Sequence, residues 1–92
     1  SDADKQAKGV ADLEGTDPAA AEAAYREVLA ADPAHEAARV GLARVLLAAP
    51  GREAEAGQLL RGVEVGAHAA EADRLRAVTA LRTDAPELAA AR

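Results

Sequence analysis

The chain has 92 residues and a formal net charge of -5, and half of its residues are hydrophobic although only one is aromatic. This length allows one domain at most, and scattered basic residues, outnumbered by acidic ones, exclude a nucleic-acid partner. The absence of cysteine excludes disulfides, thiol catalysis and thiolate metal ligands.

The apolar residues are small and aliphatic, with 28 Ala, 10 Leu and 7 Val but no Phe, Trp, Met or Ile. Alanine has the highest helix propensity, whereas strands favour β-branched and aromatic residues, so we expect an all-α fold. The missing methionine, even at position 1, predicts that the chain is an excised segment of a longer protein. Abundant Ala, and Arg in excess of Lys, indicate a bacterial source of high GC content.

Proline and glycine divide the chain into helices. The pairs Asp17-Pro18 and Asp32-Pro33 both have the pattern of a helix start, because Asp caps a helix whose first residue is Pro. Later breaks are expected at Pro50-Gly51, at Gly62 to Gly66 and at residues 83–86. We expect five helices and a short sixth one, over residues 2–14, 18–31, 34–48, 52–63, 68–82 and 84–91.

The apolar stripes of these helices recur after 35 residues. Within 18–31, one helical face carries the apolar residues Ala21, Ala24, Tyr25, Val28 and Leu29. A shift of 35 residues places seven apolar pairs in register: Ala7–Leu42, Val10–Val45, Ala11–Leu46, Ala21–Ala56, Ala24–Leu59, Tyr25–Leu60 and Val28–Val63. The chain therefore contains two similar helical hairpins, followed by a third first-helix.

A helix-pair period near 34 residues resembles the tetratricopeptide repeat family. The second helix of the first hairpin follows the family pattern of a small residue, a large one and a terminal Asp-Pro, and Leu42-Ala43 occupies its usual Leu-Gly pair. Arg39 departs from the pattern, because an aromatic residue usually stands there. The resemblance implies a single domain over residues 1–92, built as a short right-handed solenoid of stacked antiparallel hairpins. Its parts would be hairpins at 2–31 and 34–63, a capping helix at 68–82 and a tail or short helix at 83–92.

The order of the helices and the run Gly41-Leu42-Ala43 with Leu46 also resemble the C-terminal helical region of bacterial thioredoxin-fold co-chaperones. In those proteins a thioredoxin-like domain precedes a tetratricopeptide-like domain that handles client proteins. The resemblance implies that this chain is such a client-binding domain.

The sequence offers no constellation for chemistry. His35 and His68 each lie near a helix start. Equivalent turns of stacked repeats would bring them only to within about 10 Å of each other, whereas a metal or catalytic pair needs closer convergence and more ligands. The many carboxylates lie on polar helix faces. We expect no catalytic residues, no cofactor and no metal. No apolar run reaches the length that spans a bilayer, and residues 1–9 lack the apolar stretch of a signal peptide, so we expect a cytoplasmic protein and no membrane partner.

In a tetratricopeptide stack the first helices of the hairpins line a groove. The register places Lys5, Gly9 and Asp12 there, followed by Val40, Arg44, Leu47, Leu75, Thr79 and Arg82. We expect the two arginines to pair with acids of a partner, and Val40, Leu47 and Leu75 to contact its apolar side chains. For these three residues we keep the alternative that they pack on a terminal helix or on another copy. The carboxylate clamp of some family members is not expected, because Gly9 and Gly41 replace its asparagines.

The sequence therefore predicts a protein–protein interaction scaffold that binds a protein or peptide, and not an enzyme. Two alternatives remain: a homo-oligomerisation domain, which predicts a homodimer, and a regulatory docking domain of a larger enzyme.

Overall fold

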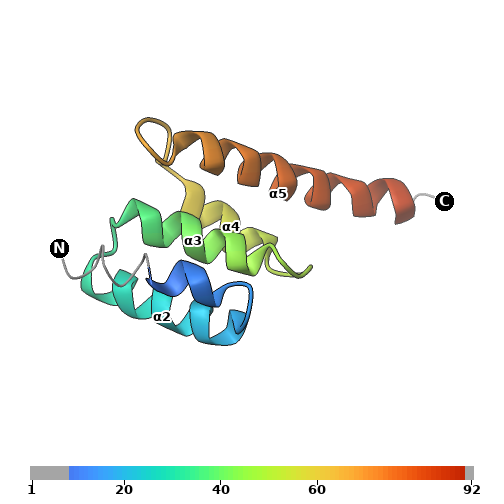
Figure 1. Cartoon of the computed structure of the whole chain (residues 1–92). Helices are drawn as coiled ribbons and strands as arrows, with labels where there is room; N and C mark the ends of the chain where they lie inside the picture. The colour runs from blue at the N-terminus through green and yellow to red at the C-terminus, as the bar shows by residue number, and fades with distance from the viewer. Residues whose placement is uncertain (1–8, 91–92) are drawn as a thin grey trace.

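The computed structural model describes the backbone of residues 9–90 and the side chains of residues 9–83. Within these residues the chain is all-α, as predicted, and contains no strand. Residues 9–13 are helical and precede four longer helices (Figure 1): α2 (Pro18–Ala31), α3 (Glu36–Leu46), α4 (Glu53–Leu60) and α5 (Ala69–Ala90). Each helix packs against the next one, and α3 also contacts α5, so α3 lies at the centre of the arrangement.

The starts of α2 and α3 differ in how they are capped. Asp17 caps α2 as predicted: its carboxylate accepts the N–H of Ala20 at 3.1 Å, and Pro18 stands in the first turn. The prediction that Asp32-Pro33 begins the next helix is wrong, because Asp32 is the C-cap of α2. Instead His35 caps α3, and its Nδ1 accepts the N–H of Ala38 at 3.2 Å.

Helix α4 is shorter than expected and ends at Leu60 rather than at residue 63. Gly62 has a φ of 81°, a left-handed conformation that interrupts the helix and that glycine adopts without strain. Two arginines donate hydrogen bonds to the carbonyl groups at this end of the helix. Arg39 of α3 donates to the carbonyl of Arg61 at 2.9 Å, and Arg76 of α5 donates to that of Leu60 at 2.8 Å. The short helix is therefore held at its C-terminus from both sides.

The last helix is longer than expected. The predicted break at residues 83–86 and the separate sixth helix at 84–91 are wrong as far as residue 90, because α5 continues through both. The hydroxyl of Thr83 does not cap a new helix. It donates within α5 to the carbonyls of Thr79 and Ala80, both at 3.1 Å. Pro86 lies inside the helix, so neither the turn residues nor the proline ended it.

The core includes three of the residue pairs that recur after 35 residues. Ala21 and Ala56, Tyr25 and Leu60, and Val28 and Val63 are equivalent pairs, and all six residues are at most 1% exposed. The alanines bring neighbouring helices close together, and the larger residues fill the space between them. This burial agrees with the hairpin repeat that the sequence indicated.

Candidate functional site

The face predicted to be a groove is closed where it crosses α3. Val40 and Leu47 are only 1% and 4% exposed, and Leu75 is half-buried against the same core. The expectation that Val40 and Leu47 present apolar side chains to a partner is therefore wrong. Both belong to the buried core of the chain.

Arg44 is the residue that joins these segments. Its guanidinium binds both carboxylate oxygens of Glu14 at 2.6 Å and one carboxylate oxygen of Glu71, in α5, at 2.5 Å. Tyr25 of α2 donates its hydroxyl to the same Glu14 at 2.5 Å. The predicted partner-binding arginine is thus already engaged by two acids of its own chain, in a network that ties four segments together.

The electrostatics of this network are those of a structural ion pair. Burial raises the pKa of Glu14, but the hydrogen bonds from Arg44 and Tyr25 outweigh it and hold this pKa below the ordinary glutamate value. Burial and the hydrogen bond to Glu14 raise the pKa of Tyr25. Glu14 is therefore ionised and Tyr25 is protonated at neutral pH, and neither is poised for proton transfer.

The remaining predicted groove residues lie elsewhere. A Cβ built on Gly57 of α4 would lie 3.9 Å from Cγ2 of Thr79. Nη1 of Arg82 lies 3.7 Å from Oε2 of Glu53, which also belongs to α4. Both residues of α5 therefore face α4 rather than an open groove. Lys5 lies outside the described residues. The 35-residue register aligns residues along the helices, but it does not determine how far a helix is rotated about its own axis.

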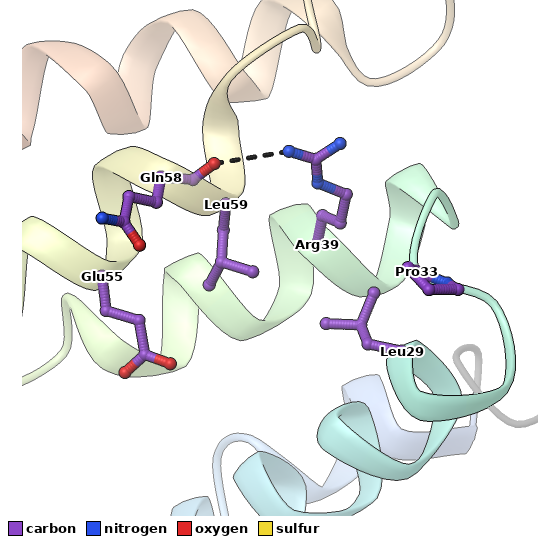
Figure 2. Close-up of a pocket in the computed structure, with 6 residues that line it drawn as sticks. All are labelled: Leu29, Pro33, Arg39, Glu55, Gln58 and Leu59. Atoms are coloured by element: carbon purple, nitrogen blue, oxygen red, sulfur yellow. Dashed lines mark hydrogen bonds between the residues drawn. The ribbon is translucent and has the colours of Figure 1, made fainter.

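An open hollow lies on another face, between α2 and α4. It has a volume of about 380 Å³ and is lined by Leu29, Pro33, Arg39, Glu55, Gln58 and Leu59. Figure 2 shows Leu29 of α2 and Leu59 of α4 pointing into the same space, above the middle of α3. Both leucines are partly buried, so each keeps some apolar surface that a ligand can cover.

The two ends of this hollow differ in charge. At one end Glu55 accepts hydrogen bonds from Arg26, at 2.8 Å, and from Arg52, and both arginines also bind Glu22. The hydrogen bond from Arg26 lowers the pKa of Glu55. Its charge is therefore balanced within the chain.

At the other end, Arg39 has donors to spare. Only its Nη2 donates to the described residues, to the carbonyls of Gln58 and Arg61 (Figure 2 shows the first), which leaves Nε and Nη1 for a ligand. The side-chain amide of Gln58, beside it, also has no hydrogen-bond partner among the described residues and is exposed. The hollow thus combines an aliphatic wall with one end that favours an anion.

The sequence had assigned Leu29 and Leu59 to core stripes and had treated Arg39 only as a departure from a repeat pattern. That departure was informative. An arginine at a position where the family usually has an aromatic residue predicts a polar group at the edge of the surface between the helices. Neither histidine contributes to the hollow, and among the described residues no group of His, Asp and Glu is arranged to hold a metal. None of the described helices combines the length and apolarity needed to cross a membrane.

Comparison with known families gives one result for this chain. Residues 13–79, from the end of the first helical segment to the middle of α5, match a family model described as a tetratricopeptide repeat. No curated protein and no solved structure matches the chain.

Proposed function

The chain belongs to the tetratricopeptide repeat family, a fold of protein–protein interaction modules, and on this premise we propose that it binds a partner protein through the hollow between α2 and α4. The observation that carries this proposal is the contrast between two faces. The face over α3 is closed by the core residues Val40 and Leu47 and by the Arg44 network, whereas the hollow is open. Binding over α3 would require a partner acid to displace Glu14 or Glu71 from Arg44.

The lining of the hollow defines the chemistry of the partner. Its volume lies at the lower end of the range for ligand sites and suits one or two side chains rather than a folded element. An aliphatic side chain would cover Leu29 and Leu59, and a carboxylate next to it would accept from the free donors of Arg39. Because Glu55 is neutralised by Arg26 and Arg52, it does not repel such an anion.

Within this function we propose that the parent protein is a bacterial, cytoplasmic thioredoxin-fold co-chaperone and that the chain is its client-binding domain. The support is the order of the helices and the Gly41-Leu42-Ala43 run, which lies within α3 and is buried. The parent gene provides the test. A thioredoxin-like coding region upstream of this segment supports the proposal, and a catalytic domain in its place favours a docking domain of an enzyme.

The binding site is tested by NMR titration of the full chain with two probes, N-acetyl-leucine and its uncharged amide. We expect N-acetyl-leucine to shift the signals of Leu29, Leu59 and the Nε group of Arg39, and the amide to bind more weakly. Gln58→Glu places a negative charge beside Arg39 without changing the core. This charge should lower the affinity for N-acetyl-leucine by about fivefold, because it repels the carboxylate, and should not change the affinity for the amide.

Two further variants complete the design. Leu59→Asn should remove binding of both probes, whereas Val65→Asn should leave both unchanged, since Val65 is 79% exposed and lies outside the hollow. Shifts confined to other faces, or equal affinity for acid and amide together with no effect of Gln58→Glu, would contradict the proposed site.

A further inference from the structure

The end of the hollow that favours an anion depends on how the guanidinium of Arg39 is held. Among the described residues this guanidinium has two acceptors, the carbonyls of Gln58 and Arg61, which its Nη2 reaches at 3.3 and 2.9 Å. Both carbonyls belong to the backbone that ends α4 and leads out of it. The direction in which the free donors Nε and Nη1 point therefore follows from the position of this backbone.

That backbone has few strong hydrogen bonds of its own. Helix α4 has only eight residues, and the last carbonyl groups of an α-helix lack the usual intrahelical partner. The two bonds that close the following turn, from the N–H of Arg61 to the carbonyl of Gln58 at 3.3 Å and from that of Val63 to the carbonyl of Leu60 at 3.2 Å, are at the long end of the usual range. Contacts from other helices therefore hold this turn in place.

Arg76 of α5 supplies such contacts. Its Nη1 donates to the carbonyl of Leu60 at 2.8 Å, and its Nη2 donates to that of Val63 at 3.2 Å. Its side chain is partly buried, and the carboxylate of Asp73, in the preceding turn of α5, accepts a further hydrogen bond from Nη2. The acceptors of Arg76 alternate along the chain with those of Arg39, so the two arginines fix the same turn.

We propose that Arg76 is a positioning residue of the hollow: by fixing residues 58–63 it orients Arg39 and so determines how strongly the hollow prefers an acid to its amide. This inference rests on the proposed function and adds a role for α5, none of whose described residues lines the hollow. Without Arg76 the turn is free to shift, and Arg39 loses the fixed acceptors that orient it. A ligand carboxylate must then order this long side chain on binding, which lowers its affinity.

A merely structural role of Arg76 leads to a different expectation. Loosening of α4 would displace Leu59, whose side chain contacts the acid and the amide alike, so both probes would lose affinity by the same factor. Loss of the orientation of Arg39 affects the acid alone, because only the carboxylate accepts from Nε and Nη1. The ratio of the two affinities therefore separates the two roles.

NMR titration of the full chain and of its Arg76→Met variant with N-acetyl-leucine and its amide measures this ratio. We expect Arg76→Met to lower the affinity for the acid by about threefold to tenfold, the factor that corresponds to ordering one long side chain, and to leave the affinity for the amide nearly unchanged. Arg76→Lys, which keeps a donor for one carbonyl, should retain part of the preference. Arg74→Met is the control, since Arg74 is exposed on the same helix and has no ion-pair partner among the described residues.

A measurement on the free chain tests the orientation directly. Nitrogen relaxation of the Nε group of Arg39 reports the mobility of its guanidinium, which Arg76→Met should increase and Arg74→Met should not. Unchanged mobility of Arg39 in Arg76→Met, or an equal loss of affinity for both probes, would overturn the inference. If neither probe binds the hollow of the parent chain, the proposed function fails, and the relaxation measurement still decides whether Arg76 orients Arg39.

Discussion

The aromatic ring of Tyr25 lies directly against the backbone of Gly41, where α2 packs on α3. A Cβ placed on Gly41 would lie 2.7 Å from Cε1 and from the hydroxyl oxygen of Tyr25, closer than real Cβ atoms come to other atoms. Tyr25 is the only aromatic residue of the chain and is 1% exposed, so its ring occupies the space that the glycine leaves. This contact joins the two hairpins and orients the hydroxyl toward Glu14.

Replacement of this glycine should be costly. We expect Gly41→Ala to lower the free energy of unfolding by about 1–3 kcal/mol, because overpacking outweighs the better helix propensity of alanine. Urea denaturation followed by circular dichroism measures the change. Adding Tyr25→Leu, the residue found at the equivalent position 60, should recover part of the loss. No recovery in the double variant would show that the ring is not what meets the new methyl group.

A glycine-to-alanine substitution in α4 should instead raise the free energy of unfolding. A Cβ on Gly57 would meet only Cγ2 of Thr79, at 3.9 Å, which is ordinary van der Waals contact. We expect Gly57→Ala to stabilise the protein by about 0.5–1 kcal/mol, because glycine in a helix interior is entropically costly. Thermal unfolding of both glycine variants under one set of conditions makes the comparison, and a lower melting temperature for Gly57→Ala would contradict the described packing of α4 on α5.

The network around Glu14 should make the free energy of unfolding depend on pH. The pKa of Glu14 in the folded chain lies below its ordinary value of 4.5, so the folded state favours the ionised form. This contribution is fully present above the unfolded pKa and is lost as the pH falls through the folded pKa. At pH 7 we expect Glu14→Gln to lower the free energy of unfolding by about 1.5–3 kcal/mol, the range for hydrogen bonds to charged groups. The difference from the parent chain should shrink below pH 4.5, and denaturation at several pH values measures it; a difference that stays constant with pH would rule out a role for this carboxylate.

The stability of the last turn of α4 should depend on Arg76. This side chain donates to the carbonyls of Leu60 and Val63 at 2.8 and 3.2 Å. Because it is partly exposed, we expect Arg76→Met to cost about 1–2 kcal/mol and to speed amide exchange in the last turn of α4. Arg74→Met is the control, since Arg74 lies on the exposed side of the same helix and has no ion-pair partner among the described residues. Equal effects of the two substitutions would argue against the carbonyl contacts.

Much of the fold could be predicted because it rests on local signals. Asp17-Pro18 located the start of α2, and the spacing of Tyr25 and Val28 identified its buried face. The 35-residue shift then identified Leu60 and Val63 as their counterparts. The ends of the other helices were less predictable, because they depend on residues far away in sequence that donate hydrogen bonds to the terminal carbonyl groups. Arg39 and Arg76 do this for α4, and neither lies near that end in sequence.

The candidate site could not be predicted in the same way. Arg44 was expected to bind a partner, yet Glu14 and Glu71 engage it, from positions 30 residues before and 27 residues after it. Val40 and Leu47 were expected at a surface and are buried. Leu29 and Leu59 pack against the core, as expected, but they also line the open hollow, which the sequence did not indicate.

The all-α fold and the buried face of α2 follow from the sequence alone, because helix propensity, caps and apolar spacing act within a few turns. The 35-residue shift also paired Tyr25 with Leu60 and Val28 with Val63, and all four are buried. Which faces stay open depends on tertiary packing, because the rotation and length of each helix depend on its neighbours. The close approach of Tyr25 to Gly41 sets how α2 lies on α3, and the contacts of Arg44 with Glu14 and Glu71 close the face over α3.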